Sequence, residues 1–284
     1  MSIIVLRIAT TLYALSAGLY VAYFARPRHA RLATAGFSVL SAAFVVHALA
    51  IGAGCREFGG KEFFTLRGGV ILAVWLAAGA YLLLHKLYRL PSVGAFVVPL
   101  ALVALIPTTL TDPSHPDVPA ELVRNAAFHV TAAVLAVALF AIAFGVALMY
   151  LLQEREVKGK RFGALFSRLP SLSTLDQLNQ RLVRAGFIAF TLALLAGTLN
   201  AAAVWKSYWS WDPQQVSSVA IWLLYAAMVQ LRHRGWHGRR YAVLTVTGFL
   251  VLAGAMGAVQ SFPGATRHTG DYGMRASAGA EVGP

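Results

Sequence analysis

A cluster of tryptophans in one short loop is the feature of this sequence most suited to chemistry. Three of the six tryptophans, Trp205, Trp209 and Trp211, fall within seven residues together with Tyr208. Trp and Tyr also form belts at the membrane–water boundary, and such a belt is the alternative interpretation. A belt alone does not readily explain so dense a cluster in one loop. Flat indole faces instead suit packing against a flat apolar ligand such as a porphyrin.

Asp212 follows these tryptophans and comes directly before Pro213. An Asp before a proline at the first helical position, with Gln215 three residues after Asp212, is the pattern of a capping box. We therefore expect Asp212 to cap the next helix and to fix how the loop leaves the membrane. A cap is a better explanation of this residue than a catalytic carboxylate.

Histidines near both sides of the Trp loop are candidate metal ligands, because neutral imidazole is a common axial ligand of haem iron. His129 lies at the start of the fifth apolar segment and His268 follows the eighth, so both flank the plane of the loop. For each one taken alone, a polar residue at a helix end is the alternative. His47 lies inside the second segment, where an ionisable residue is a functional candidate by default. A hydrogen-bonded packing role is equally open for His47.

Long apolar helices must position these residues. Of the 284 residues, 58% are hydrophobic and 12% are charged, whereas a soluble domain carries roughly 25% charged residues. In hydrocarbon every backbone N–H and C=O must be satisfied internally, so the apolar segments must be helices or a closed barrel. They are too long and too continuously apolar for barrel strands. The sequence predicts an all-α, polytopic integral membrane protein.

About eight membrane spans are expected. The candidate segments are residues 3–24, 32–54, 69–84, 92–108, 126–152, 185–204, 216–231 and 242–262. One alternating set of loops carries 16 of the Lys and Arg residues and the other carries 7, so the positive-inside rule places the first set in the cytoplasm. Both termini and the Trp loop then face the extracytoplasmic side of the cytoplasmic (inner) membrane.

The net charge of +13 belongs to these short loops. Because no basic stripe lies on a soluble domain, nucleic acid is not an expected partner and the lipid bilayer is. The connection from residue 153 to residue 184 carries Leu175, Leu178 and Leu182 at helical spacing, which predicts a short amphipathic helix at the inner surface. Residues 1–270 are expected to form one domain, and the Gly/Ala-rich residues 271–284 a disordered tail.

The loop resembles the tryptophan-rich motif of the WWD haem-handling proteins of cytochrome c maturation, and it reads W-K-S-Y-W-S-W-D-P from Trp205 to Pro213. This family comprises CcsA, its relative CcmC and the shorter HemX proteins. Residues 197–199, 221–226 and 248–250, and the segment from His129 to Arg155, also resemble the family. The similarity extends over the second half of the chain.

The resemblance implies that haem b is held outside the membrane between His129 and His268, against the Trp loop, and offered to an apocytochrome c. A CcsB/ResB-like membrane partner is implied as well, and the pair would be a holocytochrome c synthase (haem lyase). The lone Cys55 excludes a C-x-x-C-H attachment motif in this chain, so haem would be held without thioethers, whether transiently or stably.

The chain departs from this family at several positions. Gln230 stands where CcsA has a histidine of a second, intramembrane haem site, and Asn200 replaces a loop tryptophan. These differences favour a divergent or accessory member. Two alternatives stay open: a non-catalytic, HemX-like subunit that stabilises a partner complex, and a small transporter with His47 and Gln230 lining a polar path.

Overall fold

Eight α-helices make up the part of the chain that the structure describes. The structure, a computed structural model, describes residues 2–26, 29–113, 120–160, 169–205 and 207–261. The helices are α1 (Ser2–Ala25), α2 (Ala30–Phe58), α3 (Leu66–Tyr88), α4 (Pro91–Leu110), α5 (Ala120–Lys158), α6 (Leu172–Trp205), α7 (Pro213–His233) and α8 (Arg239–Ser261), with a short 3₁₀ helix, η1 (Lys61–Phe64). The predicted all-α fold class is confirmed.

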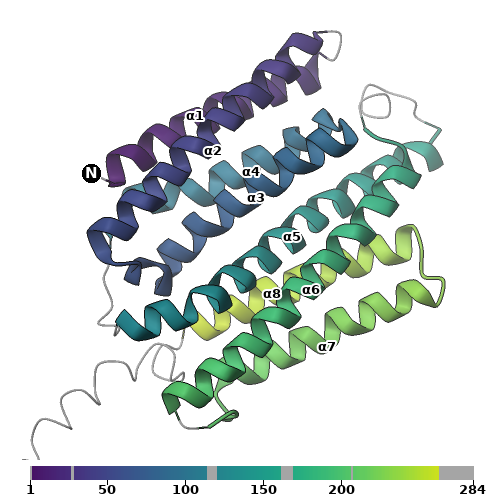
Figure 1. The fold of residues 1–284 in the computed structure, drawn as a ribbon. Coiled ribbons are helices and arrows are strands. Elements are labelled where there is room, and N and C mark those ends of the chain that lie inside the picture. Colours follow the sequence, from purple (N-terminus) through teal and green to yellow (C-terminus); the bar gives the residue numbers. More distant parts are fainter. Residues whose placement is uncertain (1, 27–28, 114–119, 161–168, 206, 262–284) are drawn as a thin grey trace, which may run out of the picture.

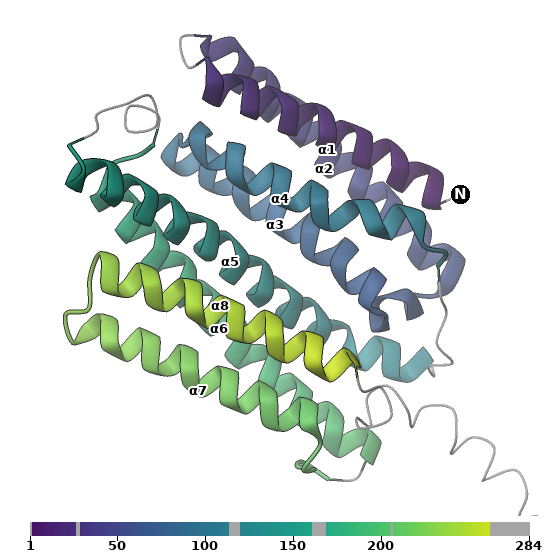
Figure 2. The ribbon, with the colours of Figure 1, turned by 180° about the vertical axis from the view of Figure 1, so that it is seen from behind.

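The helices form two antiparallel four-helix bundles. In the first bundle α1 packs against α2 and α4, and α3 closes the ring by packing against the same two helices. In the second, α5 packs against α6 and α8, and α7 closes the ring in the same way. Contacts between α3 and α5 join the bundles. Both views therefore show α1 and α2 along one edge of the molecule and α7 along the other (Figure 1 and Figure 2).

The chain is a polytopic membrane protein. Seven of the described helices are long and apolar enough to cross a bilayer, and α7 is the helix that does not meet this composition. Large apolar side chains cover the outer faces, for example Leu49, Leu195 and Leu250, each more than half exposed. An apolar outer surface of this kind is stable against lipid tails but not in water. Polar residues such as Gln214 and Ser217 lower the hydropathy of α7, which still runs antiparallel beside α6 and α8.

Small residues let aromatic side chains fill the helix interfaces. A Cβ at Gly94 on α4 would lie 2.3 Å from the Tyr81 hydroxyl and 2.7 Å from Cε1 of Tyr20. A Cβ at Gly186 on α6 would lie 2.5 Å from Cε1 of Phe140. Because association in hydrocarbon depends on close packing rather than on a hydrophobic drive, such glycines determine how near the helices approach.

The amphipathic surface helix predicted before the sixth span is wrong as a separate element. Leu175, Leu178 and Leu182 lie in the first turns of the long helix α6, and all three are buried. These three leucines face the rest of the second bundle. Their helical spacing therefore reflects packing against other helices and not contact with the membrane surface. At the start of α6 the hydroxyl of Ser171 accepts from the Thr174 N–H at 3.2 Å.

A largely buried ion pair lies at the end of the second bundle where α7 ends and α8 begins. We call this end of the molecule the basic end, because its loops carry the larger share of the Lys and Arg residues. Arg232 on α7 donates two hydrogen bonds, of 2.8 and 2.7 Å, to the two carboxylate oxygens of Asp176 on α6. Asp176 also accepts from the backbone N–H of Gly238 at 2.9 Å, in the turn before α8. The guanidinium lies over the ring of Tyr241, 5.1 Å from its centroid. One carboxylate thus joins three helices.

Candidate functional site

The Trp loop runs from the end of α6 at Trp205 to the start of α7 at Pro213. The side chains of Tyr208, Trp209 and Trp211 are exposed, Trp211 by 83%. The Trp209 and Trp211 rings meet edge to face, with centroids 5.6 Å apart and planes at 86°. Exposed indoles at a helix end offer apolar faces that a ligand or a partner can cover. Trp205 is described in its backbone only.

Side-chain hydrogen bonds give the loop a defined path. Asp212 is the N-cap of α7, and its carboxylate accepts from the Gln214 N–H at 2.8 Å. The predicted cap is therefore confirmed. The second half of the predicted capping box is different, because Gln215 Oε1 accepts from the N–H and hydroxyl of Ser210, at 2.8 and 2.9 Å, two residues before the cap. The hydroxyl of Ser207 donates to the Trp209 carbonyl at 2.6 Å. These bonds hold the residues that carry the indoles.

His129 lies in the first half of α5, at the same end of the second bundle as the Trp loop. Its Nδ1 atom is 2.7 Å from the carbonyl oxygen of Ala193 on α6. A carbonyl oxygen can only accept, so Nδ1 carries the proton and donates it. The neutral ring then has its lone pair on Nε2. This is the tautomer that metal-binding histidines use, and a backbone acceptor commonly selects it.

Gly197 lies directly against the His129 ring, and we call the space that Ala193 and Gly197 form for this ring the His129 seat. A Cβ at this position would lie 2.7 Å from Cε1 and 2.9 Å from Nδ1 of His129. These separations are shorter than a carbon–carbon or carbon–nitrogen contact allows, so the ring can lie here only over a glycine. Sequence reasoning singled out Gly197 only as part of a resemblance and missed its contact with His129. An isolated glycine inside an apolar helix is the signal that suggests such a packing role.

Asn200 lies on α6 between this histidine seat and the Trp loop. Its Nδ2 atom is buried and has no hydrogen-bond partner among the described residues. Buried amide donors are nearly always satisfied, so an orphaned one next to a candidate site points to a missing acceptor. A carboxylate, such as a haem propionate, is an acceptor of the appropriate chemistry. The donor set of one imidazole, one free amide and exposed indoles fits haem.

His268 lies outside the described residues, so its predicted convergence with His129 stays a prediction. The last described residue of α8, Ser261, ends at the same end of the bundle from which α5 starts (Figure 2). Six residues lie between Ser261 and His268, and the seven steps along the chain reach at most about 25 Å. Trp205 is about 12 Å beyond Gly197 along α6, given the helical rise per residue.

His47 is not brought together with the Trp loop. It is fully buried on α2, in the first bundle, where its Nδ1 lies 3.3 Å from the Tyr13 hydroxyl and its ring meets the Tyr13 ring edge to face. Gln230, on α7 at the opposite edge of the molecule, is exposed. The two residues that would line a transport path are therefore separated by the width of both bundles.

Comparison with known proteins identifies the family of the chain. The sequence model of the family described as cytochrome C assembly protein matches residues 8–261. The chain belongs to the cytochrome c assembly protein family. It is 30% identical over 210 residues to the cytochrome c biogenesis protein CcsA of Prochlorococcus marinus (strain NATL2A), a match that covers 63% of this chain and 66% of that protein. It is 43% identical over 86 residues to CcsA of Nostoc punctiforme, covering 30% of this chain and 24% of that protein.

This match to the cytochrome c assembly family includes α2 to α8 and all of α1 except its first six residues, with the Trp loop and His129 inside it. The family assignment from the residues of the Trp loop is therefore confirmed. The chain spans about two thirds of the Prochlorococcus protein and about a quarter of the Nostoc protein in these matches. For the whole protein, activity and partners are matters for a proposal.

Proposed function

We propose that this chain binds haem b non-covalently at the Trp-loop end of its second bundle and presents it for attachment to apocytochrome c. The observation that carries the proposal is the hydrogen bond from His129 to the Ala193 carbonyl. It selects the imidazole tautomer whose Nε2 lone pair can bind iron, and it holds the ring before any ligand arrives. Membership of the cytochrome c assembly family supports the biological setting.

Other residues have complementary roles in the proposal. His268 would supply a second imidazole to the iron. Trp209 and Trp211, exposed and held at a fixed angle to each other, pack against the porphyrin face and edge. Asn200 donates to a propionate. Asp212 acts by capping α7 and so by positioning the tryptophans.

The proposed contribution to maturation is positioning rather than nucleophilic chemistry. A thioether forms between a haem vinyl group and a cysteine thiol of the apocytochrome, and haem itself supplies that vinyl group. This chain's residues orient the haem edge toward the incoming peptide and hold the iron by axial ligation. A CcsB-like membrane protein is the proposed partner in a holocytochrome c synthase. The site would face the extracytoplasmic side of the inner membrane, as the loop charges predict.

The test is the haem content and absorption spectrum of the full chain purified in detergent. The parent is expected to retain haem with the spectrum of two axial imidazoles. His129→Ala and His268→Ala are each expected to lose haem or to change its coordination. His237→Ala, an exposed histidine at the other end of the bundle, is the matched control. If both site variants keep the parent's haem content and spectrum, the proposed ligands are wrong.

A second candidate is a non-catalytic, HemX-like accessory subunit. It is favoured by Gln230, because this exposed amide stands where the resemblance to CcsA would place an intramembrane haem ligand. Deletion of the gene separates the two candidates. A strain that still makes normal amounts of c-type cytochromes would support the accessory role, whereas loss of all c-type cytochromes would support haem presentation.

A further inference from the structure

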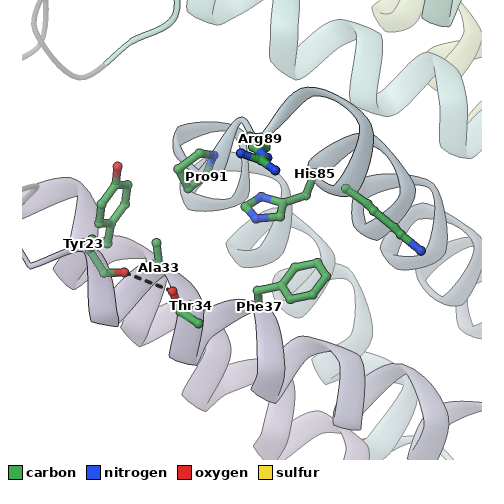
Figure 3. Close-up of a pocket in the computed structure, with 9 residues that line it drawn as sticks. Tyr23, Ala33, Thr34, Phe37, His85, Arg89 and Pro91 are labelled. Carbon is green, nitrogen blue, oxygen red and sulfur yellow. Dashed lines mark hydrogen bonds between the residues drawn. The ribbon is translucent and has the colours of Figure 1, made fainter.

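An open cavity of about 490 Å³ lies at the basic end of the first bundle, opposite the end that carries the haem site. Helices α1 to α4 all contribute to its lining, which includes Tyr23, Phe37, Lys86 and Arg89 (Figure 3). This volume is within the range of small-molecule sites. Nothing in the proposed haem chemistry uses this cavity.

The lining is cationic. Lys86 and Arg89 are both exposed at the cavity, and neither forms an ion pair with any described residue. None of the nine lining residues is Asp or Glu. The backbone of Arg89 has a left-handed φ of 51°, and its N–H donates to the His85 carbonyl at 2.8 Å, which ends α3 at the cavity wall. Two unpaired cations on one wall favour an anionic ligand.

Two helices begin at this cavity, and neither has a side-chain cap. The first residues of α2 and α4, Ala30 and Pro91, are both part of the lining. At the opposite end of the bundles, α3 and α7 are capped by Thr65 and Asp212. A helix N-terminus carries partial positive charge, which favours an anionic group. At the start of α4 Pro91 has no N–H and the Val93 N–H donates to the Leu90 carbonyl at 3.2 Å, so this start contributes through its dipole and not through free donors. The dipoles of the two helix starts add to the positive charge of Lys86 and Arg89.

Part of the lining is apolar and rigid. The Phe37 ring on α2 stacks on the His85 ring on α3, with centroids 4.7 Å apart and planes at 27°. The Tyr81 hydroxyl, 3.4 Å from Nδ1 of His85, holds that ring from the other side. Phe37, Ala33 and Pro91 form an apolar wall beside the cations (Figure 3). A free phosphate ion would leave that wall uncovered.

We infer that this cavity binds the phosphate headgroup of an anionic membrane lipid, with Lys86 and Arg89 on the phosphate and the glycerol and upper acyl chains against Phe37 and Tyr23. Basic recesses between membrane helices commonly take anionic headgroups in this way. The loop charges predict that this end faces the cytoplasm, so the lipid would come from the inner leaflet. Inorganic phosphate shares the headgroup chemistry but lacks the apolar part.

The experiment follows the thermal unfolding midpoint of the full chain in detergent. The protein is titrated separately with dihexanoyl phosphatidylglycerol, dihexanoyl phosphatidylcholine and inorganic phosphate. A ligand of the folded state raises the midpoint as its concentration exceeds Kd, so the shift reports affinity. The pocket variant is the double substitution Lys86→Gln and Arg89→Gln. The control variant, Arg234→Gln with Arg240→Gln, removes the same charge from exposed residues at the same end but outside the cavity.

Phosphatidylglycerol is expected to raise the midpoints of the parent and the control variant, with about 30-fold weaker binding by the pocket variant, from roughly 1 kcal/mol per basic residue. Phosphatidylcholine and inorganic phosphate at equal concentration are expected to leave the parent unchanged. Equal phosphatidylglycerol shifts in the pocket and control variants would overturn the site, since diffuse surface charge would explain them. No shift in the parent would also overturn it. An inorganic phosphate shift equal to that of phosphatidylglycerol would overturn the lipid assignment in favour of a free anion.

Discussion

The Nδ1 atom of His129 lies 2.7 Å from the carbonyl oxygen of Ala193, across the interface between α5 and α6. Gly197, one helical turn beyond Ala193, leaves the space that the imidazole occupies. The two positions of α6 therefore act together: the Ala193 carbonyl accepts a hydrogen bond from the imidazole, and Gly197 leaves room for the ring because it has no side chain. The proposed iron ligand is thus oriented by the neighbouring helix rather than by its own.

Gly197→Ala is expected to displace the His129 ring and to lower haem retention. The added Cβ would lie 2.7 Å from Cε1, and overpacking of this kind typically costs about 1–3 kcal/mol. The haem content and spectrum of purified protein are the measurement. Gly145→Ala on α5 is the control, because a Cβ there meets nothing within 4 Å. A Gly197→Ala protein with the parent's haem content and spectrum would contradict the proposed seat.

His129→Gly is expected to lose haem coordination and to regain it when imidazole is added. The substitution leaves a space of the ring's shape, with the Ala193 carbonyl still available as an acceptor. Glycine inside a helix costs roughly 0.5–1 kcal/mol relative to alanine, so the fold is expected to survive. Titration of imidazole while the haem absorbance is recorded is the measurement. If added imidazole does not restore haem coordination in the variant, while added haem still binds the parent, His129 has a structural role alone.

Asp212→Asn is expected to preserve function and Asp212→Ala to reduce it. Asparagine caps helices about as well as aspartate, whereas alanine removes the acceptor for the Gln214 N–H and costs about 1 kcal/mol. Because the cap holds the start of α7, its loss also loosens the Trp209 and Trp211 side chains. The comparison uses the yield of c-type cytochrome in complemented cells. Failure of Asp212→Asn at normal protein level would mean that the carboxylate charge itself takes part.

The sequence predicts the helices well because hydrocarbon leaves the backbone few choices. Each of the eight predicted segments coincides with one of the eight described helices, although α6 begins at Leu172 rather than at residue 185. The misassigned surface helix has a clear physical origin. Leu175, Leu178 and Leu182 recur on one side of a helix, and that period is the same whether the side faces lipid headgroups or other helices.

The candidate site is less predictable, because part of it depends on contacts between residues that are far apart in the sequence. The residue types of the Trp loop and the cap at Asp212 are local signals, and they could be predicted from spacing. His129 contacts Ala193 and Gly197, which are 64 and 68 residues further along the chain. Every residue has a backbone carbonyl, so the sequence does not indicate which carbonyl accepts the hydrogen bond. The packing of His85 on Phe37 is another contact between residues distant in the sequence.

Asp176→Asn is expected to lower the stability of the second bundle by about 3 kcal/mol, the usual cost of removing one member of a buried ion pair. The Arg232 side chain is only 7% exposed. In the variant it would keep its charge, lose its anionic partner and lose at least one of its two hydrogen bonds, because the amide keeps a single acceptor oxygen. The thermal midpoint in detergent measures the effect. Lys158→Met is the control, because it removes the ion pair between Lys158 and Glu154. The Lys158 side chain is 63% exposed, and surface ion pairs of this kind contribute about 0–1 kcal/mol. Equal effects of the two substitutions would mean that the Arg232 charge is solvated, and that α6, α7 and α8 are joined at this end by packing instead.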